Sequence, residues 1–383
     1  MMFSLTLLLG CPPAEDTSTP ADSSDTEEAL IPCDYVSGNI CTYAGYQGLA
    51  ALGQEGLPAN ESYLYLPQDI GFAPDGTAYL LDWNNHRIRA IAADGTITTI
   101  AGTGMLGDGP EGDAKLASFN HPTSLSFDND GNMLIAAWHN SRVDMIDMTT
   151  MELSYVAGNG SRSFGGDDGD ALLGILDLPS SAVAGADGTI YITDTANQRI
   201  RSVTTDGILH TYAGDGTAGF LGDGGPASAA ELNNPKGQSA APTGRMAISP
   251  DQKLYIADTL NQRIRVIDLA TGMIDTFAGS GTAGFAGDGG PAASAQIFSP
   301  SDVAVGVDGE LYIADTENSC VRVVTPDGNI STFAGICTEP DYTGDGGPAS
   351  AARLNKPYGV AVDADGNVFI ADTYNNSIRA VWR

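Results

Sequence analysis

Six copies of one sequence phrase constrain the fold of this 383-residue chain more than any other feature. Successive copies begin 55, 57, 64, 57 and 57 residues apart. They read LDWNNHRIR at 81–89, AAWHNSRVD at 136–144, TDTANQRIR at 193–201, ADTLNQRIR at 257–265, ADTENSCVR at 314–322 and ADTYNNSIR at 371–379. A constant period of this size indicates a supersecondary unit that is repeated six times.

Each unit reads as four short strands. A small apolar run, such as 303–305, is followed by an Asp-Gly pair in five units and by Asp251-Gln252 in the fourth. Asp-Gly between two apolar runs predicts a hairpin with a type I′ turn, because both residues tolerate a positive φ. The third strand alternates charged and aliphatic residues, as at 263–267, which predicts one buried face. The fourth ends in Ala-Gly.

The two ends of the chain predict how the repeats are joined. The sixth unit stops at Arg383, directly after its third strand. The segment ICTYAG at 40–45 matches the fourth strand ISTFAG at 330–335. An N-terminal strand that completes the last sheet closes a ring and leaves no open edge. We therefore predict an all-β fold over residues 39–383, a six-bladed β-propeller of four-stranded antiparallel blades.

The repeat pattern P-x-G-V-A-V-D-x-x-G-N-x-Y-I-A-D-T-x-N-x-R-I-R, followed by T-x-A-G, resembles the NHL-repeat family. The connection AGSGTAGFAGDGGPAASAQ at 278–296 is similar to the long inter-blade connection of bacterial members. The resemblance covers residues 39–383 and implies a propeller. It leaves the activity open, because propellers have many unrelated functions.

The N-terminal residues 1–11 resemble a bacterial lipoprotein signal, in which Cys11 would be acylated after cleavage. No Lys or Arg precedes the apolar run, so a plain hydrophobic N-terminus is the alternative. Residues 12–38 are rich in acids, Pro, Ser and Thr, and we expect a disordered tether. Together these segments predict a protein in a bacterial cell envelope, outside the cytoplasm, held to the membrane by lipid alone.

The net charge of −31, from 48 acidic and 17 basic residues, indicates which classes of partner the chain can bind. Some animal NHL propellers bind RNA on a basic face, but phosphate binding needs clustered Lys and Arg, so we exclude nucleic acid here. We expect a monomer.

Five cysteines suit an exported chain. If Cys11 is lipidated, four remain, and we favour the pairs Cys320–Cys337 and Cys33–Cys41. Four cysteines allow three connectivities, so the other pairings stay open.

An Asp recurs in five copies of the phrase and suggests a structural set. We expect it to bind turn amides and the first Arg of the phrase, rather than to form a ring of functional carboxylates. The Asn that recurs in all six copies is expected to take the left-handed conformation of a tight turn. The proposed structural residues are Asp82, Asp194, Asp258, Asp315, Asp372, Arg87, Arg199 and Arg263.

Blades 1 and 2 depart from the repeat. Trp83 and His86 lie in the first copy of the phrase, and Trp138 and His139 lie in the second, which also has Ala137 and Asp144 where Asp and Arg belong. These four aromatic residues are candidates for a recognition patch. Drift at exposed turns is the alternative.

The inter-blade connections repeat Gly-Asp-Gly. Gly and Asp suit a tight turn whose exposed amides must be capped. As a functional alternative, these loops would gather around the channel mouth and present carboxylates to a ligand or to Ca²⁺. The candidate residues are Asp108, Asp168, Asp223, Asp288 and Asp345.

The sequence offers little chemistry for catalysis. Its four histidines, at 86, 121, 139 and 210, fall at different positions of the repeat, and the chain has no Gly-x-Ser-x-Gly motif. We therefore expect no metal at the axis and no cofactor, Ca²⁺ aside. The leading hypothesis is a non-catalytic propeller that binds a protein or a glycan on its loop face. The alternatives are a lactonase- or lyase-like enzyme with a divalent ion at the channel, and a scaffold without a ligand.

Overall fold

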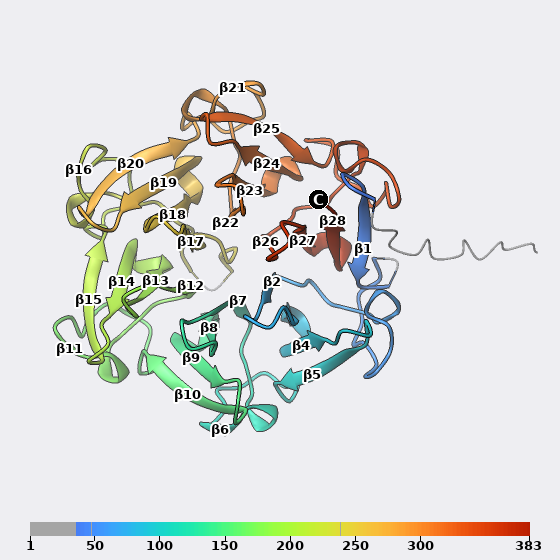
Figure 1. Ribbon diagram of the computed structural model, residues 1–383. Coiled ribbons are helices and arrows are strands. Elements are labelled where there is room, and N and C mark those ends of the chain that lie inside the picture. Colours follow the sequence, from blue (N-terminus) through green and yellow to red (C-terminus); the bar gives the residue numbers. More distant parts are fainter. Residues whose placement is uncertain (1–35, 47, 238) are drawn as a thin grey trace, which may run out of the picture. The chain divides into compact units, whose positions relative to one another are not determined.

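A computed structural model describes residues 36–46, 48–237 and 239–383 and arranges six antiparallel sheets around a central axis (Figure 1). We number these sheets blades 1 to 6 and letter their strands A to D from the axis outward. The predicted six-bladed propeller is confirmed.

Blades 1 to 3 follow one another along the chain. Blade 1 contains β2 (Asp69–Phe72), β3 (Ala78–Asp82), β4 (Arg87–Ile91) and β5 (Ile97–Ala101). Blade 2 contains β7 (Pro122–Phe127), β8 (Met133–Ala137), β9 (Arg142–Asp147) and β10 (Glu152–Ala157). Blade 3 contains β12 (Pro179–Ala184), β13 (Ile190–Asp194), β14 (Arg199–Val203) and β15 (Ile208–Ala213).

Blades 4 to 6 complete the ring. Blade 4 contains β17 (Met246–Ile248), β18 (Lys253–Asp258), β19 (Arg263–Asp268) and β20 (Met273–Ala278). Blade 5 contains β22 (Asp302–Val305), β23 (Leu311–Asp315), β24 (Cys320–Val324) and β25 (Asn329–Ala334). Blade 6 contains β26 (Gly359–Val362), β27 (Val368–Asp372) and β28 (Ser377–Val381), with β1 (Ile40–Ala44) as its D strand.

The ends of the chain close the ring as predicted. β1 runs antiparallel to β28, with Ile40 opposite Val381 and Thr42 opposite Arg379. The Thr42 hydroxyl also donates a 2.7 Å hydrogen bond to Asp345 Oδ2 in the preceding connection. Ile40 is fully buried, so the closing strand contributes to the core as well as to the ladder.

Four blades have a fifth strand that the sequence analysis did not predict. A two-residue strand from the preceding connection pairs with the outer D strand of blades 2 to 5 and lies at the rim in Figure 1. An unpaired outer strand would expose a row of amide and carbonyl groups, and the connection covers the start of that edge. These strands are β6 (Gly112–Asp113), β11 (Gly169–Asp170), β16 (Gly225–Pro226) and β21 (Gly290–Pro291).

A 3-10 turn then leads each connection back between two blades, and its first alanine is buried there. Ala114, for example, packs with Ile88 of blade 1 and Leu125 of blade 2. Six such interfaces form the hydrophobic core, as expected for sheets packed face to face. The turns are η1 (Ala59–Glu61), η3 (Ala114–Leu116), η5 (Ala171–Leu173), η7 (Ala227–Ala229), η9 (Ala292–Ser294) and η11 (Ala349–Ala351).

A second set of 3-10 turns joins strands B and C. The residue that follows each turn has a left-handed conformation, for instance His86 with φ 51°. The recurring Asn is the last residue of the turn and is not itself left-handed, so that prediction was wrong. These turns are η2 (Trp83–Asn85), η4 (Trp138–Asn140), η6 (Thr195–Asn197), η8 (Thr259–Asn261), η10 (Thr316–Asn318) and η12 (Thr373–Asn375).

The Asp-Gly hairpins form between strands A and B, but with a different turn type. Gly76 has φ 85°, whereas Asp75 is not left-handed. A positive φ at the last residue alone is typical of a three-residue hairpin loop, not of the predicted type I′ turn. Gln252 takes the same conformation in blade 4, with φ 60°.

Cys320 and Cys337 form a disulfide with their Cα atoms 5.0 Å apart. Cys41 is also disulfide-bonded. Its expected partner, Cys33, lies outside the described residues, as do Cys11 and residues 12–35 of the predicted tether. Across the described ranges, we find no helix with the length and apolarity required to cross a membrane.

Candidate functional site: the loop face and the central channel

The ring has two faces with different backbone structure. The B–C turns and the residues just before the A strands form one face, which we call the loop face. The A–B and C–D hairpins form the other, the hairpin face. On the loop face each turn is pinned by one amide, as when Tyr374 N–H donates to Asn355 O at 3.1 Å.

The recurring Asp of the phrase accepts the hydrogen bonds that hold this turn in place. Asp258 is fully buried, and its Oδ1 accepts the Asn233 N–H at 2.8 Å. Its Oδ2 accepts from Asn261 Nδ2 at 2.8 Å and Arg265 Nη1 at 3.3 Å. Burial raises the pKa of Asp258 to about 6. Asp82, Asp194, Asp315 and Asp372 lie in the same arrangement.

The partner of each Asp is the second Arg of the phrase, so the predicted pairing with the first was wrong. In a regular strand Arg263 and Arg265, two residues apart, would share one face, but β19 has a register shift between Ile264 and Arg265 in its pairing with β20. Arg263 instead donates to the carbonyls of Asn261 and Ser280. Arg199 makes the equivalent bonds, and Arg87 lies 3.6 Å from Glu55.

The acidic connections do not gather at the channel mouth. Asp223 bonds Arg265 and the Thr276 hydroxyl of an outer strand, both at 2.7 Å. The carboxylates therefore link connections to outer strands. Asp288 bonds Arg322 and Thr332, Asp345 bonds Arg379 and Thr42, and Asp108 bonds Arg142.

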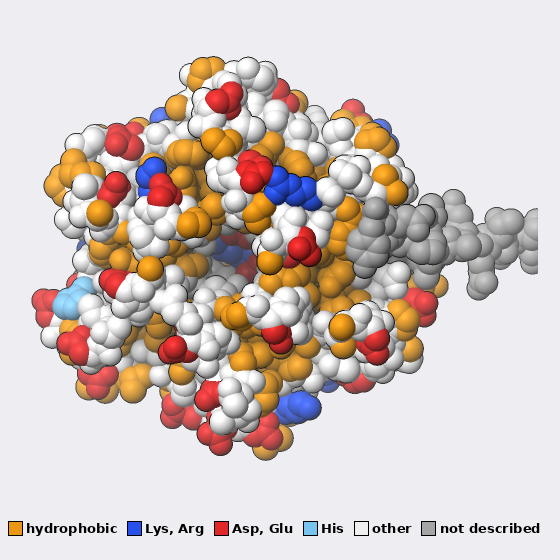
Figure 2. Space-filling model, viewed as in Figure 1, with side chains coloured by type: hydrophobic (Ala, Val, Ile, Leu, Met, Phe, Trp, Pro, Cys, Tyr) orange, Lys and Arg blue, Asp and Glu red, His pale blue; other side chains and the backbone are white. Residues whose placement is uncertain are grey.

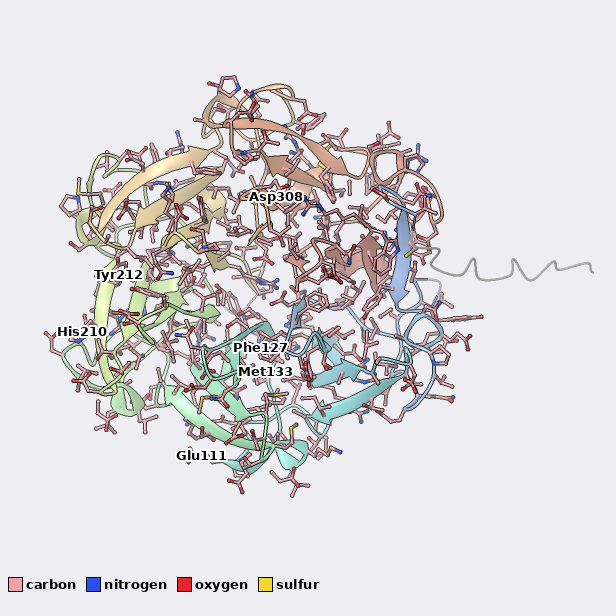
Figure 3. All side chains as sticks on the ribbon, viewed as in Figure 1. Glu111, Phe127, Met133, His210, Tyr212 and Asp308 are labelled. Atoms are coloured by element: carbon pink, nitrogen blue, oxygen red, sulfur yellow. A yellow bond between two sulfur atoms is a disulfide. The ribbon has the colours of Figure 1, made fainter. Side chains whose placement is uncertain are left out.

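In blade 3 the carboxylate that links the connection to the outer strand lies one residue before the predicted Asp168. Asp167 bonds Arg201 and Thr211, whereas Asp168 accepts a 2.8 Å hydrogen bond from His210 Nδ1 at the rim (Figure 3). Across residues 36–46, 48–237 and 239–383, no three or more His, Cys, Asp or Glu side chains are grouped to hold a metal ion.

A cavity of about 460 Å³ follows the axis and is lined by the A strands of all six blades. Most of the residues that line it are apolar, including Ile70, Phe127, Val303 and Val360. Figure 2 shows it as a hollow at the centre of the ring. These apolar residues offer contact area to a ligand but no reactive group.

Arg245 occupies the polar end of this cavity and is 1% exposed. Its Nη1 lies 3.5 Å from Asp302 Oδ2 and 3.8 Å from Asp69 Oδ1, and it donates to Gln68 O at 2.8 Å. Burial raises the pKa of both carboxyls, that of Asp69 to about 7, against the lowering effect of Arg245. Two carboxylates thus converge at the axis, but a guanidinium lies between them.

These carboxylates also hold blades together. Asp69 of blade 1 accepts Leu125 N–H of blade 2 at 2.9 Å, and Asp302 of blade 5 accepts Val360 N–H of blade 6 at 3.0 Å. The sequence analysis missed this cluster. The signal was present, because Arg245 alone is basic at a repeat position otherwise occupied by Asp69, Ser124, Ser181, Asp302 and Gly359.

Blades 1 and 2 form a cluster of tryptophan and histidine on the loop face. The Trp83 and His121 rings lie 4.5 Å apart, and His86 is edge-on to His121 at 4.7 Å. His139 is 5.1 Å from His121, and Trp138 is 6.1 Å from His139. The structure therefore brings together all four predicted recognition residues, with His121 at their centre.

This cluster replaces two hydrogen bonds that join other blades. Thr259 donates to Pro300 O at 2.9 Å, and Gln262 Oε1 accepts Ser299 N–H at 2.6 Å. Trp83 and His86 take these two places in blade 1. Trp83 Nε1 and His86 Nδ1 are buried without a hydrogen-bond partner, which is an unusual cost for a purely structural contact.

Burial favours the neutral form of two histidines of the cluster, His121 and His86. Burial, assisted by His86 and His139, lowers the pKa of His121 to about 4. Burial also lowers the pKa of His86. Neutral imidazoles can accept hydrogen bonds or bind a metal ion.

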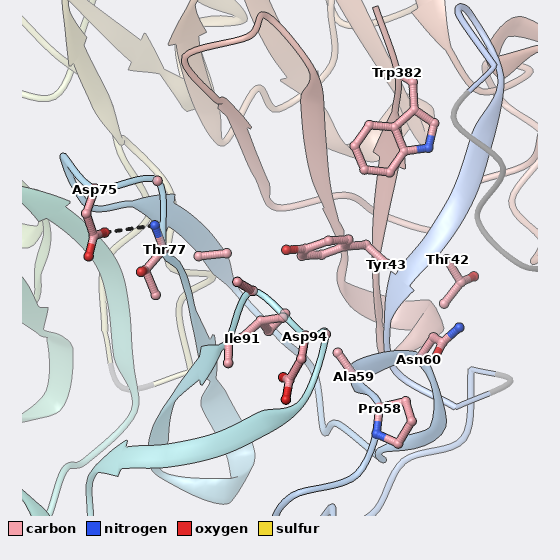
Figure 4. A pocket seen from close by; sticks show the side chains of 15 residues that line it. Thr42, Tyr43, Pro58, Ala59, Asn60, Asp75, Thr77, Ile91, Asp94 and Trp382 are labelled. Carbon is pink, nitrogen blue, oxygen red and sulfur yellow. Dashed lines mark hydrogen bonds between the residues drawn. The ribbon is translucent and has the colours of Figure 1, made fainter.

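A second cavity of about 450 Å³ lies where the ring closes, between blades 6 and 1 (Figure 4). Tyr43, Asn60 and Trp382 line it, with the turn residues Asp75 and Asp94. Both carboxylates already accept turn amides, from Thr77 and Thr96. Blade 6 takes its D strand from the N-terminal β1, so this edge of the cavity is not bordered by a C–D hairpin.

Comparison with known proteins agrees with the architecture. The NHL-repeat family model matches residues 299–324 and 354–380. Teneurin-m of Drosophila melanogaster is 29% identical over 84% of this chain and 12% of its own length. The chloroplastic protein SUPPRESSOR OF QUENCHING 1 of Arabidopsis thaliana is 27% identical over 71% of this chain and 26% of its own.

The chain thus spans a minor part of these relatives. Among solved structures, an auxiliary nutrient binding protein from Bacteroides thetaiotaomicron has a TM-score of 0.63 at 16% identity, covering 89% of this chain and 75% of that protein. At this identity the likeness shows the fold alone. The chain is a six-bladed β-propeller, and its blades 5 and 6 match the NHL repeat.

Proposed function

We propose that this NHL-repeat propeller is a non-catalytic binding protein that recognises a protein or a glycan through its loop face. The supporting observation is a constant backbone that carries variable side chains. In every blade the second residue of the B–C turn donates its N–H to the carbonyl two residues before the proline. This turn residue differs in all six blades: it is Asn84, His139, Ala196, Leu260, Glu317 and Tyr374. A rigid scaffold with variable surface positions is typical of binding sites.

The loop face also exposes large apolar residues. Leu260 is 45% exposed, Phe298 38% and Tyr374 50%, while Tyr358 stacks beneath Tyr374 at 6.3 Å. Aromatic residues held in place lose little entropy on binding and contribute much contact area. The Trp–His cluster extends this face over blades 1 and 2.

The enzyme alternative has weaker support. Six-bladed propeller enzymes gather ligands for a metal at the channel, whereas Arg245 occupies that position between Asp69 and Asp302. A guanidinium cannot ligate a cation and repels one. A lactonase or lyase mechanism would need Arg245 to move away.

Location outside the cytoplasm fits the disulfide chemistry. The Cys320–Cys337 bridge would persist in an oxidising compartment. We further propose that lipid at Cys11 holds the propeller to the bacterial envelope through the acidic tether. Cys11→Ser should release the protein into the soluble fraction; unchanged membrane fractionation of this variant would argue against the anchor.

The binding proposal is tested by immobilising the full chain and screening glycan arrays and solubilised envelope proteins. The triple variant Leu260→Ser, Phe298→Ser, Tyr374→Ser should lose the captured ligand. The control Met273→Ser, Val307→Ser removes exposed apolar residues at the C–D and A–B hairpins and should retain it. Equal retention by both variants, or metal-dependent lactone hydrolysis by the wild type, would overturn the proposal.

A further inference from the structure

We propose that His121, His139 and Asn120 form a binding site for one divalent transition-metal ion, such as Zn²⁺, Ni²⁺ or Cu²⁺, on the loop face between blades 1 and 2. This inference does not rest on the proposed binding function.

The distances between the three donor atoms carry the argument. His121 Nδ1 lies 3.1 Å from His139 Nδ1 and 2.9 Å from Asn120 Oδ1. Two ligand atoms that lie about 2.1 Å from a metal ion in adjacent positions are about 3 Å apart. Asn120 Oδ1 and His139 Nδ1 therefore both lie at the distance from His121 Nδ1 that two ligands of one metal ion would show.

The two segments that carry these donors are fixed to each other. His139 N–H donates to Asn120 O at 3.2 Å, and Asn120 N–H donates to Asn140 Oδ1 at 2.9 Å. Asn140 Nδ2 in turn donates to Gly107 O at 2.9 Å. Such outer hydrogen bonds orient ligands before a metal binds.

Blade 2 departs from the repeat at the residues that form this arrangement of donor atoms. In the other five blades an Asp carboxylate receives the amide that Asn140 receives here. The equivalents of His121 and His139 in blade 4 are Asn234 and Leu260, which cannot form such a pair.

The donor set selects the class of ion. Two imidazole nitrogens and one amide oxygen suit borderline metals, whereas Ca²⁺ and Mg²⁺ prefer oxygen ligands alone. His121 and His139 are each partly exposed, so water can complete the coordination.

The test uses the full chain with Cys11→Ser, so that no free thiol at that position competes. Zn²⁺ and Ni²⁺ are titrated by calorimetry, and Cu²⁺ is added for electron paramagnetic resonance, which reports bound nitrogens. We expect one ion per chain, two coordinated imidazoles, and no competition from millimolar Ca²⁺.

Sister blades supply variants that keep the fold. His139→Ala copies Ala196 of blade 3, and His121→Asn copies Asn234 of blade 4. Each should weaken binding at least tenfold and remove one nitrogen from the copper spectrum. His210→Ala, at a rim histidine far along the chain (Figure 3), should leave both unchanged.

Absence of binding at 1 mM metal would overturn the site. So would affinity that survives both His139→Ala and His121→Asn, or that is lost with His210→Ala. Circular dichroism of each variant establishes that it is folded before titration.

Discussion

Arg265 and Asp258 form an ion pair inside blade 4 in which both side chains are wholly buried, with 3.3 Å between Nη1 and Oδ2. Asp223 bonds the same guanidinium from the connection. Each of five blades therefore joins its phrase, its B–C turn and its connection through one arginine. Blade 2 lacks this arginine.

Removing one partner of the buried pair should be costly. We expect Asp258→Ala to lower the free energy of unfolding by about 3–5 kcal/mol, because Arg265 is left charged and without its inner partner. Urea unfolding followed by circular dichroism measures this. Asp251→Ala breaks a surface pair with Lys253 and should cost no more than about 1 kcal/mol; similar losses from both variants would contradict the argument.

Asp144 of blade 2 should make stability depend on pH. It occupies the place of the missing arginine, one of its oxygens has no partner, and burial raises its pKa from 3.8 to about 7. The folded state then binds a proton more tightly than the unfolded chain, so stability falls as pH rises from about 4 to 7.

We therefore expect Asp144→Asn to match the wild type near pH 4 and to be more stable above pH 7. The gain is bounded by about 4 kcal/mol, since three pKa units correspond to that energy. Chemical unfolding at pH 4, 5.5, 7 and 8 gives the difference. A constant difference across this range would mean that Asp144 is not protonated in the fold.

Repetition made the fold predictable, because an error in reading one blade is corrected by the other five. The closing strand followed from the match of residues 40–45 to 330–335. The fifth strands did not, because two residues such as Gly112 and Asp113 carry no periodic signal. The pairing of Asp258 with Arg265 rather than Arg263 could not be predicted, because the register shift of β19 between Ile264 and Arg265 leaves no signal in the alternating sequence.

The candidate site was predictable only where a blade departs from the repeat. Trp83, His86, Trp138 and His139 stood out for this reason. His121 was missed, because the residue before this proline follows no repeat pattern; the other blades have Leu66, Leu178, Asn234, Ser299 and Lys356 there. Arg245 was missed because its partners lie in other blades. Asp69 of blade 1 and Asp302 of blade 5 come close to Arg245 of blade 4 only at the axis of the ring.

We expect Arg245 to be required for the stability of the buried charge cluster at the polar end of the channel. Arg245→Met leaves Asp69 and Asp302 buried without a cation, and we expect a loss of about 3–5 kcal/mol at pH 7. Adding Asp69→Asn and Asp302→Asn should recover part of that loss, since no unpaired charge then remains. Thermal unfolding compares the single and triple variants. A triple variant less stable than Arg245→Met would show that the carboxylates act chiefly as acceptors of blade amides.

The Cys320–Cys337 disulfide should stabilise the chain by about 3 kcal/mol, as expected for a loop closed by 17 residues. The double variant Cys320→Ala, Cys337→Ala should show the corresponding fall in urea midpoint. Reductant should lower the midpoint of the wild type more than that of the variant, in which only the bridge of Cys41 is left to reduce. Equal responses to reductant would assign the effect to Cys41.

The Trp–His cluster can be returned to the ordinary repeat. Trp83→Thr with His86→Gln introduces the residues of blade 4, where Thr259 donates to Pro300 O and Gln262 accepts Ser299 N–H. Each restored hydrogen bond contributes about 1 kcal/mol. We therefore expect the free energy of unfolding to stay within about 1 kcal/mol of the wild type, while ligand capture on the loop face decreases.

Substitution of Thr195 and Gln198 in blade 3 by Trp and His serves as the reverse exchange and should not transfer binding. If the blade 1 variant instead loses more than about 3 kcal/mol, the aromatic packing is structural, and blades 1 and 2 depart from the repeat for stability rather than for recognition.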